Sequence, residues 1–386
     1  MDRYIAGKKT MEGSVAVAET IVNVDPDVVA CFPITPSTHI AEHLDKAYTD
    51  GRLKKFIAVD SEFAAISTLV GASAAGARVF STTASQGLAL MHEVLFAAAG
   101  MRLPIVMVVA NRSLSAPLSI WNDHQDTLAE RDSGWIQFYC ESNQEVVDTI
   151  PIAYRVAEEN HLPVMVNMDG FYLTHAIEQI VIPSHEDIIG FIGEYDPEIK
   201  LDPEHPVALG VYAKPEHYQA FRVGLDRDMF AVKDRIVKHA NDWYNLIGRK
   251  HDNGLFEDYY ASEAEYVLIA MSSVCGNAKE VVDDLRSKGL SVGLLRIKTY
   301  RPFPYEEVGR LLSNAKSIGI FEKTLSMGAY TPLYQDVITS LRLVGSENVP
   351  VSSFLGGLGG RDITEEHIRE MFKVIEKGKP VRDYVW

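Results

Sequence analysis

The chain has 386 residues, 47% of them hydrophobic, which suffices for two or three domains with their own cores. Its 53 acidic residues outnumber 37 basic ones, and the formal net charge of −16 opposes binding to nucleic acids and anionic membrane surfaces. Cys31, Cys140 and Cys275 are far apart and form no C-x-x-C pair. We therefore expect no disulfide framework, no metal site and no iron–sulfur cluster in this chain.

The N-terminal segment MDRYIAGKKTMEGS lacks the apolar stretch of a signal peptide. No apolar run reaches the length of a membrane-spanning helix. We expect a protein of the reducing cytoplasm with no membrane partner.

Residues 14–180 alternate short aliphatic runs with helical patterns. The aliphatic runs predict strands over Val28–Phe32, Lys55–Val59, Arg78–Thr82, Ile105–Val109 and Pro163–Met168. The patterns between them predict helices over Thr38–Tyr48, Glu62–Gly76, Gly87–Ala99 and Asn143–Glu159. Continuous hydrophobic strands interleaved with helices indicate an α/β fold with a doubly wound parallel sheet, covered on both faces.

The alternation resumes later in the chain. An acidic, proline-containing stretch over 183–202 predicts a crossing segment, and 216–249 predicts a long helix. From EYVLIAMSS to IGIFEKT the pattern is that of a compact β-α-β-α-β unit. A strand over Val349–Leu355 and a helix over Glu365–Lys377 follow.

Polar segments follow several predicted strands, at the edge where a parallel sheet binds its ligands. In CFPITPST (31–38), Pro33 and Pro36 flank Ile34 and Thr35 and stiffen the backbone, which would present the Thr35 hydroxyl in a fixed direction. A rigid strand-to-helix turn, capped by the Ser-Thr pair that follows, explains the same residues.

Glu62 begins a helix of small residues in VDSEFAAISTLVGASAAGARVF (59–80). An acid in a first helical turn is commonly explained by the helix dipole. Burial of this helix start would instead indicate function, because an unpaired buried carboxylate is costly. In STTASQGLALMHEVLF (81–96), Gln86 and Gly87 let a ligand or another backbone come close, and simple helix packing explains them equally well. This stretch lacks the glycine patterns of dinucleotide-binding and P-loop proteins.

Arg112 ends a strand in VVANRSLSAPLSIWNDHQD (108–126), where it is placed to bind a small carboxylate in bidentate fashion. The loop that follows carries Asp123, His124 and Asp126, whose spacing matches no zinc pattern and favours a hydrogen-bonded scaffold. GGLGGRD (356–362) is only a weak indication of phosphate contact.

Nine motifs occur in order: FPITPST, SEFAA, TASQGLALM, NRSLSAP, WNDHQD, RDSGWIQFY, MDGFYLTH, YRPFP and LGGRDIT. Together they resemble the alpha subunit of 2-oxoacid:ferredoxin oxidoreductases, and most closely the multi-subunit pyruvate:ferredoxin oxidoreductases. The resemblance implies a thiamine diphosphate enzyme. Residues 1–240 would form the pyrimidine-binding domain with a long helical extension, 262–345 a domain like the C-terminal domain of transketolase, and 346–386 a tail packing on the core.

The resemblance also implies partners. A beta subunit would share the thiamine diphosphate and supply Mg²⁺ and an iron–sulfur cluster, a delta subunit would carry further clusters, and a gamma subunit would help bind coenzyme A. Pyruvate would be oxidised to acetyl-CoA and CO₂ with coenzyme A as co-substrate and ferredoxin as electron acceptor, or formed in the reverse reaction.

Site residues follow from the matching motifs. Glu62 would lie against N1′ of the cofactor's aminopyrimidine, Thr35 would hydrogen-bond the substrate, and Arg112 would hold its carboxylate. These three are the predicted catalytic residues; Pro33, Ile34 and Gln86 complete the predicted cofactor contacts.

Other interpretations remain open. The chain could serve an enzyme for branched-chain 2-oxoacids, 2-oxoglutarate or oxalate, although branched-chain members tend to differ at WNDHQD. A beta chain of a 2-oxo acid dehydrogenase is not expected to combine PITP with NRSLSAP. A purely structural assembly subunit is disfavoured because Thr35, Glu62 and Arg112 are all present.

Overall fold

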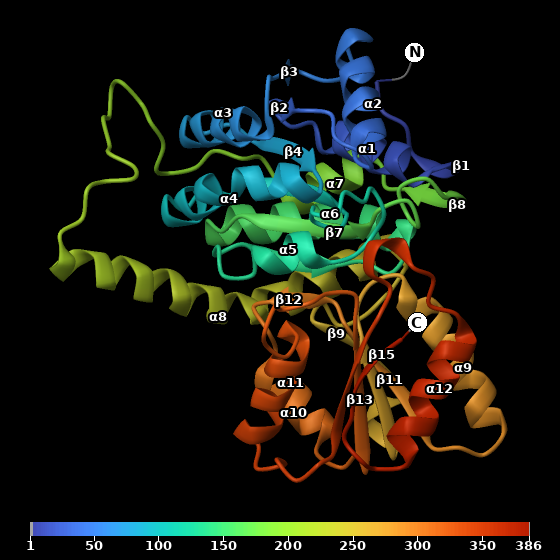
Figure 1. Cartoon of the computed structure of the whole chain (residues 1–386). Coiled ribbons are helices and arrows are strands. Elements are labelled where there is room, and N and C mark those ends of the chain that lie inside the picture. The colour runs from blue at the N-terminus through green and yellow to red at the C-terminus, as the bar shows by residue number, and fades with distance from the viewer. Residues whose placement is uncertain (1–2, 386) are drawn as a thin grey trace.

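The computed structural model of the chain describes residues 3–385. Two α/β parts lie one above the other in Figure 1, each built around its own sheet. A separate antiparallel ribbon pairs β1 (Gly7–Glu12) with β8 (Ile177–Ile182).

The first sheet has seven strands in the spatial order β12-β6-β7-β5-β4-β2-β3. They are β2 (Val28–Cys31), β3 (Phe56–Ala58), β4 (Val79–Thr83), β5 (Val106–Asn111), β6 (Ile136–Tyr139), β7 (Val164–Asp169) and β12 (Thr299–Arg301). Only β12 runs antiparallel to its neighbour. The doubly wound parallel sheet is confirmed, with its five predicted strands correct to within two residues, whereas β6 and β12 escape the sequence analysis.

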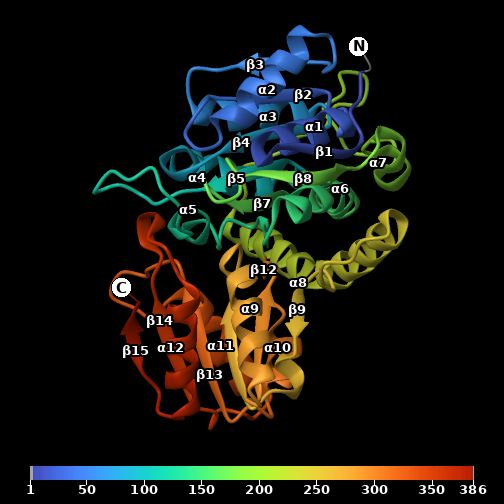
Figure 2. The same ribbon diagram turned by 90° about the vertical axis from the view of Figure 1, so that its right-hand side faces the viewer.

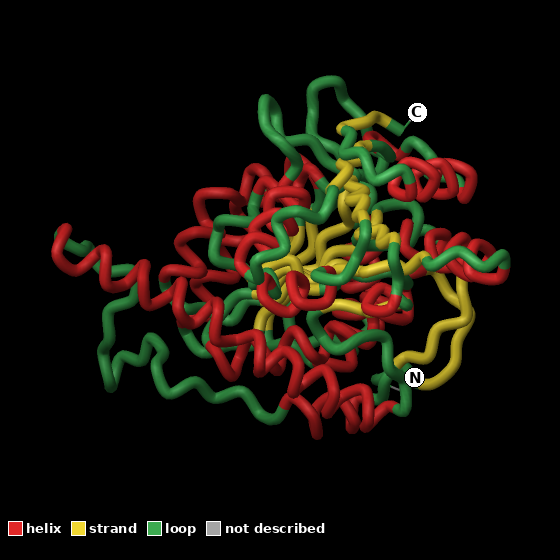
Figure 3. The backbone as a smooth tube through the Cα atoms, turned by 90° about the horizontal axis from the view of Figure 1, so that it is seen from below, coloured by secondary structure: helices red, strands yellow, loops and turns green. Residues whose placement is uncertain are grey.

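Helices cover both faces of this sheet (Figures 2 and 3). They are α1 (Gly13–Val24), α2 (Thr38–Thr49), α3 (Glu62–Ala74), α4 (Ser85–Gly100), α5 (Gln125–Ala129), α6 (Asn143–Asn160) and α7 (His185–Ile192). The four predicted helices begin within two residues of their expected starts. Hydroxyl caps explain two of these starts, since Ser61 accepts from the Ala64 N–H and Ser142 from the Glu145 N–H, both at 3.2 Å.

The predicted crossing segment, 183–202, is only partly irregular. It contains α7, which begins where Ser184 accepts a hydrogen bond of 3.0 Å from the Asp187 N–H. Residues 193–214 contain no helix or strand and swing away from the first sheet before α8 (Pro215–Ile247) begins (Figure 1). Despite the length of α8, no helix within residues 3–385 is both long and apolar enough to cross a membrane.

The second sheet has six strands in the order β15-β14-β13-β10-β11-β9. Its elements are β9 (Phe256–Tyr259), η1 (Ala261–Glu263), β10 (Tyr266–Ala270), α9 (Val274–Ser287), β11 (Val292–Ile297), α10 (Tyr305–Leu312), β13 (Ser317–Glu322), α11 (Pro332–Leu343), β14 (Val351–Leu355), η2 (Leu358–Gly360), α12 (Glu365–Glu376) and β15 (Arg382–Tyr384). The segment expected to be a tail packing on the core, 346–386, supplies β14, α12 and β15. It is thus built into the second sheet, because β14 pairs in parallel with β13.

Buried charges connect the two parts. Arg296 on β11 donates to Glu145 on α6 at 2.9 Å and to Asp252 at 3.2 Å, while Lys298 Nζ lies 2.6 Å from Glu145. All four side chains are buried. Burial alone would raise the pKa of Glu145, but the two cations hold it well below its usual range.

Candidate active site

The predicted site residues lie at the carboxyl edge of the first sheet. Thr35 follows β2, Glu62 follows β3, Gln86 follows β4 and Arg112 follows β5. Since these four strands are neighbours in the sheet, the residues share the crevice where parallel α/β sheets bind ligands.

The turn over residues 33–36 presents Thr35 to solvent while burying Pro36. The hydroxyl of Ser37 does not cap α2; it donates to the Ile34 carbonyl at 2.8 Å and closes the turn. Gly170, on the loop after β7, lies against Pro36, since a Cβ at that glycine would come within 2.5 Å of the proline ring. The expected rigid turn is present, but it is held by the Ser37 hydrogen bond and by packing against Gly170, and not by the predicted cap.

Arg112 and Thr35 are in direct contact. Arg112 Nη1 donates to the Thr35 carbonyl and Nε to the Ser119 carbonyl, both at 2.9 Å. The arginine is 7% exposed, and burial lowers its pKa, a shift that nearby Asp126 opposes. The guanidinium therefore has a fixed direction beside the Thr35 turn.

Asp126 holds the carboxyl edge of the first sheet together. The sequence predicts a scaffold in this loop but does not assign that role to a single residue. Its carboxylate accepts from the backbone N–H groups of Arg112 (2.9 Å) and Ser85 (3.0 Å) and from Asn111 Nδ2 (3.0 Å). Burial raises the pKa of Asp126 to about 6. The expected hydrogen-bonded scaffold is present, and it ties the ends of β4 and β5 together.

Glu62 is buried at the first position of α3, with 7% of its surface exposed. Within residues 3–385 its carboxylate has no hydrogen-bond or ion-pair partner. A Cβ on Gly87 would lie 2.5 Å from Glu62 Oε1 and 2.6 Å from Thr83 Oγ1, itself a buried hydroxyl without a partner. Gly87 thus keeps α4 close to an acid that no neighbour neutralises, which favours the functional interpretation of Glu62.

Gln86 lies in the first turn of α4, half-buried. Ser85, which begins the helix with a left-handed φ of 49°, places its hydroxyl 2.5 Å from Gln86 Oε1. Gln86 is thus oriented by its neighbour next to Gly87. No contact within the described chain joins Glu62 or Gln86 to Thr35 directly.

Asp169, at the end of β7, links the site to the second part of the molecule. It lies 2.7 Å from His124 Nε2 and accepts from Ser272 Oγ at 2.7 Å and Lys323 Nζ at 3.0 Å. Burial alone would raise the pKa of Asp169, but Lys323 and His124 hold it well below its usual range. No local pattern predicts this contact, because its partners are distant in the chain.

A cavity of about 760 Å³ lies beside these loops. It is lined by Trp121, Phe171, Tyr172, Leu355, Gly356, Gly357, Leu358, Gly359, Gly360, Arg361, Asp362, Tyr384 and Val385. The Gly360 N–H donates to the Asn122 carbonyl at 2.6 Å, and a Cβ at Gly360 would lie 2.4 Å from Trp121 Cβ. These glycines thus serve the close packing of two loops, while their phosphate contact stays a prediction.

Two solved structures share this architecture. The 2-oxoglutarate:ferredoxin oxidoreductase from Magnetococcus marinus matches with a TM-score of 0.69 at 19% identity, over 97% of this chain and 66% of that chain. A split-gene transketolase in an inactive tetramer matches with a TM-score of 0.56 at 13% identity, over 96% of this chain and 98% of that one. The fold is therefore the two-part α/β fold found in a 2-oxoacid oxidoreductase and in a transketolase.

Relatives with high sequence identity identify the family more closely than the shared fold does. The pyruvate synthase subunit PorA of Methanothermobacter thermautotrophicus is 45% identical over 381 residues, covering 98% of this chain and 97% of the relative. The corresponding subunit of Thermotoga maritima is 42% identical over 387 residues, with 99% and 98% covered. The ketoisovalerate oxidoreductase subunit VorA of Pyrococcus abyssi is 38% identical over 392 residues, with 100% and 99% covered.

Two family models match successive parts of the chain. Residues 19–241 match the thiamine diphosphate-binding domain of pyruvate flavodoxin/ferredoxin oxidoreductases, and residues 264–368 match core domain II of pyruvate:ferredoxin oxidoreductase. The chain belongs to the pyruvate:ferredoxin oxidoreductase family.

The residues at the sheet edge fit the aminopyrimidine half of thiamine diphosphate. The Glu62 carboxylate lacks a partner in the described chain, the Thr83 hydroxyl is buried without one, and Gly87 offers no side chain that would fill the space beside them. A ring nitrogen could serve as the missing partner of the acid.

Proposed function

We propose that this chain is the alpha subunit of a pyruvate:ferredoxin oxidoreductase, acting in oxidative decarboxylation of pyruvate or in its reverse. The observation that carries the proposal is Glu62, a residue only 7% exposed whose carboxylate has no partner within the described chain, lying against Gly87 in the matched thiamine diphosphate-binding domain. Pyruvate is favoured as substrate because the pyruvate synthase subunits are 42–45% identical, against 38% for the ketoisovalerate enzyme subunit.

Three side chains would make this chain's contribution to the reaction. When bound, thiamine diphosphate supplies a carbon nucleophile and an electron sink for decarboxylation. Glu62 would hold a proton at N1′ of the aminopyrimidine. Arg112 would bind the pyruvate carboxylate, and Thr35 would hydrogen-bond the substrate from the turn whose carbonyl already accepts from Arg112. Pro33, Ile34 and Gln86 would line the cofactor.

The enzyme would act in the cytoplasm as an assembly of alpha, beta, gamma and delta subunits. In this arrangement the beta subunit supplies Mg²⁺, an iron–sulfur cluster and the diphosphate half of the cofactor site. The delta subunit carries further clusters, and the gamma subunit helps bind coenzyme A. Ferredoxin takes the electrons. The loop between β5 and α5, which projects from the first sheet in Figure 2, exposes Leu118, Ile120 and Trp121 and offers an apolar contact to such a partner.

The test is an assay of the complex purified anaerobically with its natural partners. We would follow ferredoxin reduction with coenzyme A and, in turn, pyruvate, 2-oxoisovalerate, 2-oxoglutarate and oxalate. Fast reduction with pyruvate is expected. A preference for 2-oxoisovalerate would overturn the choice of pyruvate and support the second candidate, a ketoisovalerate oxidoreductase, whose subunit VorA is 38% identical over the whole chain.

The same complex tests the role of Glu62. Replacing Glu62 by Gln should lower the turnover rate at least about 100-fold, because a proton-transferring group contributes on that scale. Glu93→Gln, on the exposed face of α4, is the matched control and should leave the rate unchanged. Near-normal turnover of the Glu62→Gln complex would refute the proposed role.

A further inference from the structure

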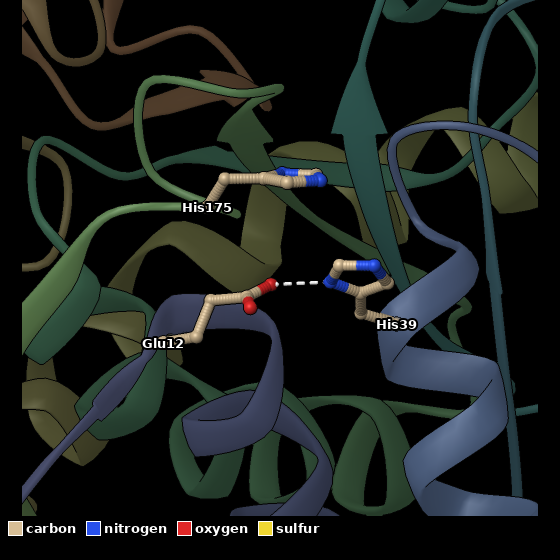
Figure 4. A group of neighbouring side chains, drawn as sticks. All are labelled: Glu12, His39 and His175. Carbon is tan, nitrogen blue, oxygen red and sulfur yellow. Dashed lines mark hydrogen bonds and ion pairs between the residues drawn. The ribbon is translucent and has the colours of Figure 1, made fainter.

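Two imidazoles and a carboxylate meet at the start of α2 (Figure 4). Glu12 ends β1, His39 lies in the first turn of α2, and His175 lies on the loop between β7 and β8. One ligand atom from each residue lies within 4.8 Å of those of the other two. His39 Nδ1 is 2.7 Å from Glu12 Oε1, and the two imidazole centroids are 4.8 Å apart.

The backbone fixes two of the three residues relative to each other. Glu12 pairs with Ile177 at the end of the β1–β8 ribbon. Backbone hydrogen bonds of 3.0 and 2.9 Å then run from residues 13 and 14 to residues 176 and 174, on either side of His175. Gly13 permits this approach, since a Cβ there would lie 2.2 Å from a backbone oxygen of the facing loop. The carboxylate and the imidazole are thus held side by side before any ligand arrives.

His175 has the chemistry of a metal ligand. Its Nδ1 lies 2.7 Å from the Thr174 hydroxyl, the kind of contact that orients a ligating imidazole through its other nitrogen. With Nδ1 held by Thr174, the other ring nitrogen, Nε2, is available to a ligand.

We propose that Glu12, His39 and His175 bind one divalent transition-metal ion, with Zn²⁺ the best match. Two imidazoles and a carboxylate are a frequent zinc set, with bonds of about 2.0–2.2 Å and a fourth position open. Such bonds require the three ligand atoms to approach to about 3.5 Å of one another. Because His39 is exposed on the first turn of α2, its side chain is free to make that adjustment.

From the position of the site, a bound ion would have a structural role, linking three elements of the fold. His39 is four residues beyond Thr35, and the other two ligands lie on β1 and on the loop that follows β7. A bound ion would strengthen the link between the start of α2, with the Thr35 turn, and these two elements, which so far rests on the packing of Gly170 against Pro36 and on the contact between His39 and Glu12. The site is separate from the cofactor residues described above, so its test does not depend on the proposed activity.

The test is zinc binding by the full-length chain, purified without a polyhistidine tag and stripped with a chelator. Titration with ZnCl₂ against a chromophoric competitor should show one equivalent bound. Glu12→Gln, His39→Gln and His175→Gln should each weaken the affinity more than about tenfold. His205→Gln is the matched control, because His205 is an exposed histidine beside a single carboxylate, Asp202, at 3.3 Å, and it should bind zinc as the wild type does.

The interpretation without a metal is that His39 and Glu12 form an ordinary surface ion pair, which contributes little. Equal zinc affinity in the wild type and in His39→Gln would establish that interpretation and overturn the proposal. Loss of affinity in His205→Gln equal to that in His39→Gln would also overturn it. Circular dichroism of each variant separates lost binding from lost folding, and His39→Gln, at an exposed position, is expected to remain folded.

Discussion

If Arg112 binds the substrate carboxylate as proposed, its contacts hold it in place before the substrate arrives. Its Nε and Nη1 each donate to a backbone carbonyl, and its own N–H donates to Asp126. A side chain held at two points, on a backbone anchored at a third, loses little further freedom when it binds a carboxylate. This arrangement depends on the planar fork of arginine, which lysine lacks.

Arg112→Lys should therefore lower kcat/KM for the 2-oxoacid by about 10–100-fold, the scale of one or two hydrogen bonds to a charged group. The loss should fall mainly on KM, because the contact with the carboxylate is already made in the ground state. Steady-state kinetics of the assembled enzyme measure both constants. Arg131→Lys, at a half-exposed arginine whose Nη1 donates to the Leu128 carbonyl, is the control and should change neither. An unchanged KM in Arg112→Lys would exclude carboxylate binding by this residue.

At the scale of elements, the approach of α4 to α3 depends on Gly87. Gly87→Ala should displace the Glu62 carboxylate, because the added Cβ would lie 2.5 Å from Oε1. We expect at least about a tenfold loss of turnover with the chain still folded, since misplacing a reacting group by an ångström can cost about 100-fold. Turnover of the complex and the thermal midpoint of the chain measure the two effects.

Gly71→Ala is the matched control for that substitution. Gly71 lies inside α3 with no atom within 4 Å of an added Cβ. The change should leave turnover intact and raise the free energy of unfolding by about 0.5–1 kcal/mol, because alanine loses less backbone entropy than glycine. Equal turnover in both alanine variants would mean that Gly87 does not position Glu62.

A buried acid at the end of β13, Glu322, contacts the start of α11 and should make stability depend on pH. Glu322 accepts from the Leu333 N–H at 2.8 Å and the Tyr334 N–H at 3.2 Å, and burial raises its pKa to about 7 from an ordinary 4.5. Between these values the folded chain binds more protons than the unfolded chain. The contribution of Glu322 to stability is therefore complete below pH 4.5 and is lost as the pH rises through about 7.

Glu322→Gln should remove this pH dependence. Between pH 5 and 8 the wild type should lose on the order of 2–3 kcal/mol more of its free energy of unfolding than the variant. Denaturant titrations of both proteins at several pH values give the difference directly. Since Asp126 titrates in the same direction in both proteins, it cancels from that comparison. Parallel curves for the two proteins would contradict the assignment to Glu322.

Hydrophobic and helical patterns in the sequence predicted the helices and strands that form from residues close together in the chain. The five central strands are continuous aliphatic runs, and α2, α3, α4 and α6 have clear starts, so their bounds were found within a few residues. The strand β12 was missed because it pairs over a long separation, Thr299 lying opposite Phe138, and β6 was missed because IQFY is not a continuous aliphatic run. The motifs also placed Thr35 and Arg112 at one sheet edge, but not the contact between them or the anchoring by Asp126, which depend on loop packing.

At the scale of the whole molecule, the two α/β parts are joined by buried charges as well as by apolar contacts. Arg296 and Lys298 come from the second part, and Glu145 comes from α6 of the first. A buried pair of this kind adds little net stability over apolar residues, but removing one member leaves an uncompensated charge. A single substitution in this network should therefore lower the free energy of unfolding of the whole chain.

Arg296→Met should lower the free energy of unfolding by about 3–5 kcal/mol, because Glu145 would stay buried beside Lys298 alone. Denaturant unfolding followed by circular dichroism reports on both parts of the molecule together. Arg310→Met removes an exposed partner of Glu306 on α10 and should cost at most about 1 kcal/mol, since solvent screens that pair. Equal costs for the two substitutions would mean that the Arg296 network contributes no more to joining the two parts than a surface ion pair does.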